Sequence, residues 1–118
     1  PAGVTNSRTN GVSDDGTVVV GEGIGALDMT AVVWRCVSIV CTGAELDSPL
    51  GGSTAVDASG NGSVLAGGAH NGSDFQIARW LYNESTLTYD FEFLSNPAGT
   101  RTGAVRAISA DGTTIVGG

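Results

Sequence analysis

Two kinds of apolar segment occur along this chain of 118 residues. In the first kind, as in Val18–Val20 and Val64–Ala66, apolar residues follow one another without a break. Such a run predicts a strand that is buried on both faces. In the second kind, as in Tyr89–Phe93, aromatic and acidic residues alternate, which predicts an outer strand with one apolar and one solvated face.

Short polar turns separate these segments. Three of the turns contain an acid-Gly or Asn-Gly pair, at Asp15-Gly16, Asn61-Gly62 and Asp111-Gly112. Such pairs tolerate positive φ at both central positions of a type I′ turn, so each predicts a hairpin. Further polar segments at 71–74 and 83–86 predict turns before strands at 75–82 and 87–94.

These turns belong to an internal repeat. Ser13 and Ser59 lie 46 residues apart, and so do Trp34 and Trp80, whereas Ser59 and Ser109 are separated by 50 residues because four extra residues follow Trp80. Four strands in about 46 residues is the size of a propeller blade. We therefore expect an all-β fold of four-stranded antiparallel blade repeats, arranged as a β-propeller-like ring or an open blade array. A single domain would cover 1–118, with repeat one at about 4–49, repeat two at about 50–99 and half of a third repeat at about 100–118.

Composition and charge narrow the partners. The chain has 19 glycines and only 14% charged residues, and its net charge is −7 without a single lysine. No basic patch is available to neutralise phosphates, which argues against nucleic acid. No apolar run approaches the roughly 18 to 20 residues of a membrane span, so no membrane insertion is expected. Because the chain opens on Pro1 and not on Met, we expect a mature form from which a signal segment was removed.

Two cysteines, Cys36 and Cys41, are separated by four residues. This spacing lets the two side chains face each other across the end of a hairpin, and a local disulfide is the first interpretation. Buried thiols are the alternative, whereas a structural zinc site would need four ligands. A disulfide indicates an oxidising compartment, and hence an extracellular or cell-surface location.

The order of motifs within a repeat is distinctive. An apolar-Ser-x-Asp-Gly turn is followed by an apolar strand ending in Gly, by an Ala-x-x-Trp strand and by Leu50-Gly51-Gly52. This order resembles the HAF-type extracellular repeats of bacterial surface and secreted proteins. The resemblance implies a β-propeller-like array, secretion and surface association, and it brings no catalytic residues.

The third repeat contains only its first hairpin. Two and a half blades cannot close a ring, because propellers typically have about four to eight blades. Either the chain is a fragment of a longer array, or copies associate with one another through their terminal strands. We expect self-assembly into a filament, surface layer or adhesin, with an interface formed by Val4, Val12, Val105, Ile108, Ile115 and Val116.

Other candidate sites have structural alternatives. Trp34 and Trp80 are candidate stacking platforms for carbohydrate in an oligomeric propeller lectin, or they belong to the core. The turn carboxylates are candidate calcium ligands, or they form local Asx hydrogen bonds; they are Asp14, Asp15, Asp57, Asp74 and Asp111. Asp90 and Glu92 lie on one face of a strand, but no nucleophile or base converges there. We therefore expect no enzyme activity, no cofactor and no metal.

Overall fold

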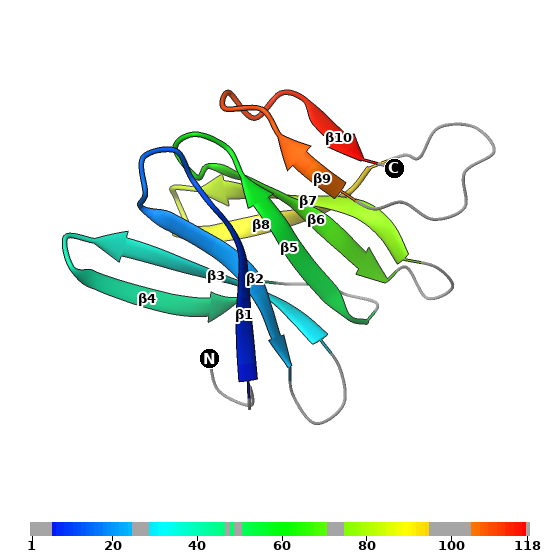
Figure 1. The fold of residues 1–118 in the computed structure, drawn as a ribbon, viewed down its shortest axis with the longest axis horizontal. Coiled ribbons are helices and arrows are strands. Elements are labelled where there is room, and N and C mark those ends of the chain that lie inside the picture. Colours follow the sequence, from blue (N-terminus) through cyan, green and yellow to red (C-terminus); the bar gives the residue numbers. More distant parts are fainter. Residues whose placement is uncertain are drawn as a thin grey trace.

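Ten strands and no helix make up the described part of the chain in the computed structural model (Figure 1). The structure describes residues 6–24, 29–46, 48, 51–70, 75–94 and 105–117. The strands are β1 (Asn6–Val12), β2 (Val18–Ile24), β3 (Met29–Val37), β4 (Val40–Glu45), β5 (Ser53–Ala58), β6 (Val64–His70), β7 (Phe75–Asn83), β8 (Thr88–Phe93), β9 (Val105–Ile108) and β10 (Ile115–Gly117). Within these residues, therefore, no helix is long and apolar enough to cross a membrane.

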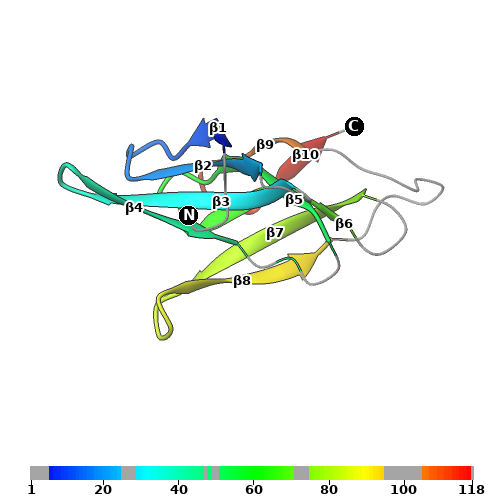
Figure 2. The same cartoon turned by 90° about the horizontal axis from the view of Figure 1, so that it is seen from below.

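The strands form two four-stranded antiparallel sheets and a third sheet of two strands. Each large sheet is a meander in sequence order, β1-β2-β3-β4 and β5-β6-β7-β8, and β9 pairs with β10. Sheet β1–β4 lies over sheet β5–β8 (Figure 2). The all-β fold of repeated four-stranded antiparallel sheets is confirmed. The described residues do not form a closed propeller.

The three Gly-containing loops share one geometry, but it is not the expected type I′ turn. Gly16, Gly62 and Gly112 have φ of 75°, 75° and 77°, whereas the preceding Asp15, Asn61 and Asp111 are not among the residues with positive φ. A type I′ turn requires positive φ at both positions. The prediction of type I′ turns was therefore wrong, although all three loops do connect antiparallel strands.

A serine closes each of these loops instead. The Val18 N–H donates to Ser13 Oγ at 3.0 Å, and Ser13 Oγ donates to Asp15 Oδ1 at 2.7 Å. Ser59 accepts from the Val64 N–H at 3.0 Å, and Ser109 accepts from the Thr114 N–H at 3.0 Å. The serine side chain thus supplies the acceptor that a regular strand pair would take from the backbone.

Each first strand also carries a β-bulge. The register shifts between Thr9 and Gly11 and between Ala55 and Asp57, which leaves Asn10 and Val56 at equivalent bulged positions. In both repeats, a glycine of the second strand pairs with the residue that precedes the bulge in the first strand. A Cβ at Gly21 would collide with the Arg8 carbonyl oxygen. The close approach of the two backbones explains why these strands contain glycine.

The core lies between the two large sheets. Repeat one contributes Val18, Val20, Ala31, Val33 and Leu46, and repeat two contributes Ala55, Ala58, Leu65, Ala69, Ala78, Trp80 and Tyr89. The register of each sheet places most of these residues on one face of the pleat, such as Val20 beside Val33 and Leu65 beside Trp80. One face of repeat one therefore packs on the opposite face of repeat two.

Candidate functional site: the faces between repeats

A valine of one repeat packs on the turn glycine of the next repeat. A Cβ at Gly62 would collide with the Val18 side chain, and a Cβ at Gly112 would lie 2.8 Å from Val64 Cγ2. Val18 and Val64 are equivalent positions, as are Gly62 and Gly112. The contact between repeats one and two is thus built again between repeats two and three.

Backbone hydrogen bonds join the same loops. The Asp15 N–H donates to the Gly60 carbonyl at 3.0 Å, and the Gly60 N–H donates to the Ala110 carbonyl at 2.7 Å. Glycine, which has no side chain, lets the loops approach this closely at Gly60. The three loops therefore form a continuous row across the repeats.

A polar cluster connects the first strands of repeats one and two. Glu22 is only 4% exposed and accepts from Thr54 Oγ1 at 2.7 Å and from Arg8 Nε at 3.0 Å. Asn10, the bulge residue, donates to the Ala55 carbonyl at 2.9 Å. Burial by itself would raise the pKa of Glu22, but the hydrogen bonds from Thr54, Asn10 and Arg8 and the charge of Arg8 outweigh it, and the pKa is lowered.

The corresponding outer face of repeat one is open in part, around Gly16 and Trp34. Within the described residues, no atom lies within 4 Å of a Cβ added at Gly16, whereas the equivalent Gly62 is covered by Val18. Trp34 is half-buried, whereas the equivalent Trp80 is 0% exposed. The face that repeat two buries against repeat one is thus exposed on repeat one around Gly16 and Trp34, whereas Val32, on the same face of β3, is 0% exposed.

The two tryptophans differ in what they can do. The Trp80 ring packs edge-on against Phe91 at a centroid distance of 5.6 Å and presents no surface to a ligand. Of the two alternatives for Trp80, a ligand platform or a core residue, the structure shows the core residue. Trp34 lies beside Gly43, and a Cβ there would come within 2.7 Å of Trp34 Nε1. An oligomeric lectin that stacks sugars on both rings is not favoured by this arrangement.

The predicted assembly residues have different surroundings. Val12 and Val116 are each 53% exposed, and Ile108 and Ile115 are half-buried and lie opposite each other in one strand pair. Val105 is only 7% exposed, so most of its surface is already covered within the chain. Val4 lies outside the described residues. The predicted interface of terminal strands therefore stays a prediction. The spacing of Gly16, Gly62 and Gly112 in the sequence already indicated a second candidate surface, around Gly16.

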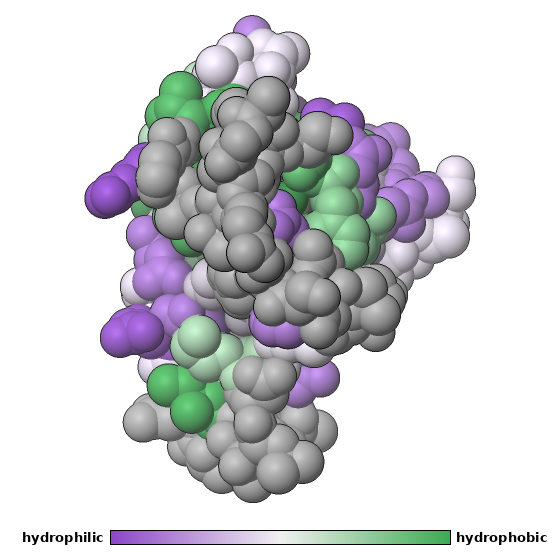
Figure 3. Space-filling view, turned by 90° about the vertical axis from the view of Figure 1, so that its right-hand side faces the viewer, coloured by the Kyte–Doolittle hydropathy of each residue, from purple (hydrophilic) through white to green (hydrophobic). Residues whose placement is uncertain are grey.

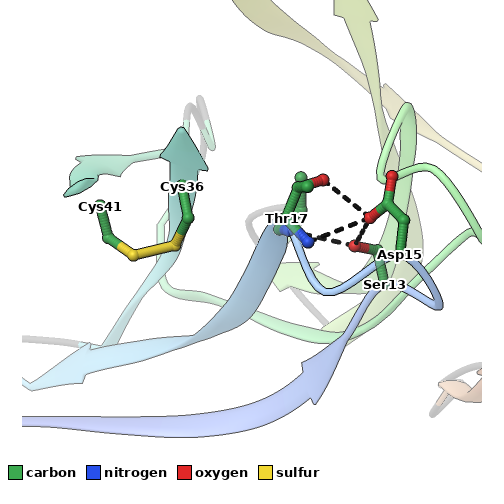
Figure 4. Close-up of a disulfide and its surroundings, with 6 residues drawn as sticks. Ser13, Asp15, Thr17, Cys36 and Cys41 are labelled. Carbon is green, nitrogen blue, oxygen red and sulfur yellow. Dashed lines mark hydrogen bonds between the residues drawn. A yellow bond between two sulfur atoms is a disulfide. The ribbon is translucent and has the colours of Figure 1, made fainter. Parts of the chain in front are cut away.

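Cys36 and Cys41 form a disulfide, as expected. They are direct partners in the β3–β4 pair, and the turn between them places Ser38 at φ 58°. Figure 4 shows the disulfide on the β3–β4 hairpin near the loop that contains Ser13, Asp15 and Thr17. Three large apolar side chains at the hairpin tip are strongly exposed, namely Val37, Ile39 and Val40 at 79%, 95% and 66%.

Two of the turn carboxylates, Asp15 and Asp111, are occupied by local hydrogen bonds. Asp15 Oδ1 accepts from Ser13 and Thr17 (Figure 4), and these bonds lower the pKa of Asp15. Bonds from Ser109 and Thr113 lower the pKa of Asp111 to about 2. Asp57 accepts from the Ile108 N–H at 3.1 Å. Among the described residues no three His, Cys, Asp or Glu side chains gather as metal ligands would; Asp74 lies outside those residues.

Asp90 and Glu92 do not converge on a common centre. Asn83 Nδ2 donates to Asp90 at 3.2 Å, and Arg79 Nε donates to Glu92 at 2.7 Å. Each carboxylate therefore pairs with its own neighbour on β7, as side chains on a solvated sheet face commonly do.

No protein-family model, curated protein or solved structure matches this chain. The resemblance to HAF-type repeats therefore stays a prediction. What the structure defines is a class: an all-β protein of repeated four-stranded antiparallel sheets with one disulfide.

Proposed function

We propose that this chain is an extracellular structural module that self-assembles by stacking repeats head to tail. The observation that carries the proposal is the open face of repeat one around Gly16 and Trp34, whose counterpart in repeat two is buried by a preceding repeat. A repeat of the same kind fits this face, and we propose that a second copy supplies it. Contacts of this type join unlike surfaces and generate rings or filaments.

The contact between copies involves the part of the open face around Gly16 and Trp34. Its outer part, on β4, carries Gly43 and Glu45 where repeat two carries aromatic residues. The association between copies is therefore weaker than the packing of repeats within a chain and depends on concentration. On the side of the molecule shown in Figure 3, the described apolar residues (green) lie in separate groups between hydrophilic ones (purple).

The disulfide supports the extracellular part of the proposal. A disulfide persists in secreted and surface proteins but is rare in the reducing cytosol. It therefore supports a secreted or surface-associated subunit.

A substitution at Gly16 tests the proposal. Asn tolerates the positive φ at this position, and no described residue of the chain comes within 4 Å of a Cβ added there. In a head-to-tail assembly, the Gly16→Asn side chain would meet Thr114 of the incoming half repeat, which stands at the position of Val18 and Val64, just as a Cβ at Gly62 meets Val18. We expect sedimentation velocity to show concentration-dependent oligomers for the wild-type chain and monomers for Gly16→Asn.

Gly62→Asn is the matched control, because the same change at an internal interface should destabilise the folded chain itself. Trp34→Ser is a second variant that removes the exposed part of the face and should also weaken association. A wild-type chain that stays monomeric at high concentration, or a Gly16→Asn variant that assembles as the wild type does, would overturn the proposal.

A further inference from the structure

A cavity of about 300 Å³ lies between the outer parts of the two large sheets. Its walls include Val33 and Ala44 from the β3–β4 pair, Leu46 just beyond β4, and Leu87 from the β7–β8 turn. Val33 and Leu46 are buried, whereas Leu87 is 73% exposed and closes one side. The volume is at the small end of the range for ligand pockets, which is about 300 to 1,000 Å³.

Arg35 brings a positive charge to this mostly apolar cavity. Its Nη1 donates to the Tyr89 hydroxyl at 2.7 Å, and its guanidinium lies 4.0 Å from the centre of the Tyr82 ring. Tyr89 in turn donates to the Gly62 carbonyl at 2.7 Å, which fixes the hydroxyl as an acceptor for Arg35. Burial raises the pKa of Tyr89, opposed by the charge of Arg35, so this hydroxyl stays protonated.

No carboxylate in the described part of the chain pairs with Arg35. The ion pairs there join Arg8 with Glu22 and Arg79 with Glu92. The charge of Arg35 makes only the smallest contribution to the lowered pKa of Asp15. Glu45 lies at the cavity, but strand alternation directs its side chain away from the face that carries Ala44.

We propose that this cavity binds a small monocarboxylate with a compact apolar body. The carboxylate would accept hydrogen bonds from the guanidinium nitrogens that Tyr89 does not occupy, and the body would contact Val33, Leu46 and Leu87. A half-buried cation without a counter-ion is costly, and an anionic ligand removes that cost. In a protein of net charge −7, a single unpaired cation facing an apolar wall selects for a single negative charge.

Benzoate is the probe, because it joins a carboxylate to a compact apolar ring. Benzyl alcohol keeps the ring without the charge, and acetate keeps the charge without the ring. Titrations followed by amide NMR shifts should show benzoate binding at least ten-fold more tightly than either. The shifts should concentrate on 33–35, 42–46 and 87–89, the segments that surround the cavity.

Two variants probe the charge and the space separately. Arg35→Gln should weaken benzoate binding at least ten-fold, whereas Arg106→Gln, an exposed arginine on β9, should bind as the wild type does. Ala44→Phe, at an exposed position on β4, should fill the cavity and block binding while the fold is kept.

The proposal fails if benzoate produces no saturable shifts at these segments, if benzyl alcohol binds as tightly, or if both Arg35→Gln and Ala44→Phe bind normally. The cavity lies within one chain. Its test is therefore independent of self-assembly and can be made on the monomeric Gly16→Asn variant.

Discussion

The two complete sheets share their loops, bulges and strand order, but their outer strands are held in different ways. Strand β8 faces repeat one with Tyr89, Phe91 and Phe93, and the Phe91 and Phe93 rings meet edge-on at 4.7 Å. The matching face of β4 carries Cys41 and Gly43, and most of β4 is exposed. Aromatic packing holds one outer strand, and a covalent bond holds the other.

This difference follows from what covers each sheet. The aromatic face of β8 lies against repeat one, where apolar area is removed from water and stabilises the sheet. The equivalent face of β4 has no repeat over it within the described chain, so aromatic residues there would stay wet. A disulfide between cross-strand neighbours fixes β4 without needing a neighbouring repeat.

Removing the central aromatic side chain of repeat two should have the largest effect. Trp80→Ala deletes a fully buried ring that packs on Phe91, and we expect a loss of about 3–5 kcal/mol in the free energy of unfolding. Urea denaturation followed by circular dichroism measures this loss.

Trp34→Ala is the matched control, since Trp34 occupies the same position on a face without a neighbour. Its cost should be clearly smaller than that of Trp80→Ala. Equal losses for the two variants would mean that coverage by a neighbouring repeat does not distinguish them.

Opening the disulfide should have the next largest effect. For a closed loop this short, chain entropy predicts a loss of about 2 kcal/mol in the Cys36→Ser, Cys41→Ser double variant. Hydrogen exchange should accelerate at the amides of β4 and leave those of β8 unchanged, because β8 is held by side-chain packing. A uniform acceleration over both sheets would contradict the comparison.

Much of this architecture follows from local sequence. Asp-Gly and Asn-Gly pairs between apolar runs place the hairpins, and the period of 46 residues places the repeats, because both are set by short-range backbone and side-chain chemistry. The cysteine spacing similarly predicts the disulfide, because the two residues lie opposite each other in a hairpin.

Other features depend on which surfaces meet. The sequence around Trp34 and Trp80 is alike, yet only Trp80 has a repeat packed over it. The cavity beside Arg35 also escaped prediction, because it combines a β3–β4 face with a turn some fifty residues away. The serine that closes each loop was visible in the repeat, but its role needed the backbone geometry that excludes a type I′ turn.

Acidification should have the smallest of these effects, and it should destabilise sheet β1–β4 more than sheet β5–β8. Glu22 of β2 has Gly68 as its equivalent in repeat two, so only repeat one holds a buried carboxylate at this position. Because hydrogen bonds and Arg8 lower the pKa of folded Glu22 below its ordinary 4.5, the unfolded chain binds this proton more readily. The stabilisation is complete above that value and is lost as the pH falls through the lower pKa of the folded state.

Glu22→Gln isolates this contribution from those of Asp15 and Asp111, whose lowered pKa values both chains share. Thermal unfolding should show the wild type more stable than Glu22→Gln at neutral pH, with the gap narrowing on acidification below 4.5. In the wild type, amides of β1 and β2 should exchange faster in acid before those of β5 and β6, since the polar cluster anchors β1 through Arg8 and Asn10. A gap that widens in acid would mean that Glu22 is stabilised in its protonated form, and the hydrogen bonds from Thr54 and Arg8 would then not govern its charge.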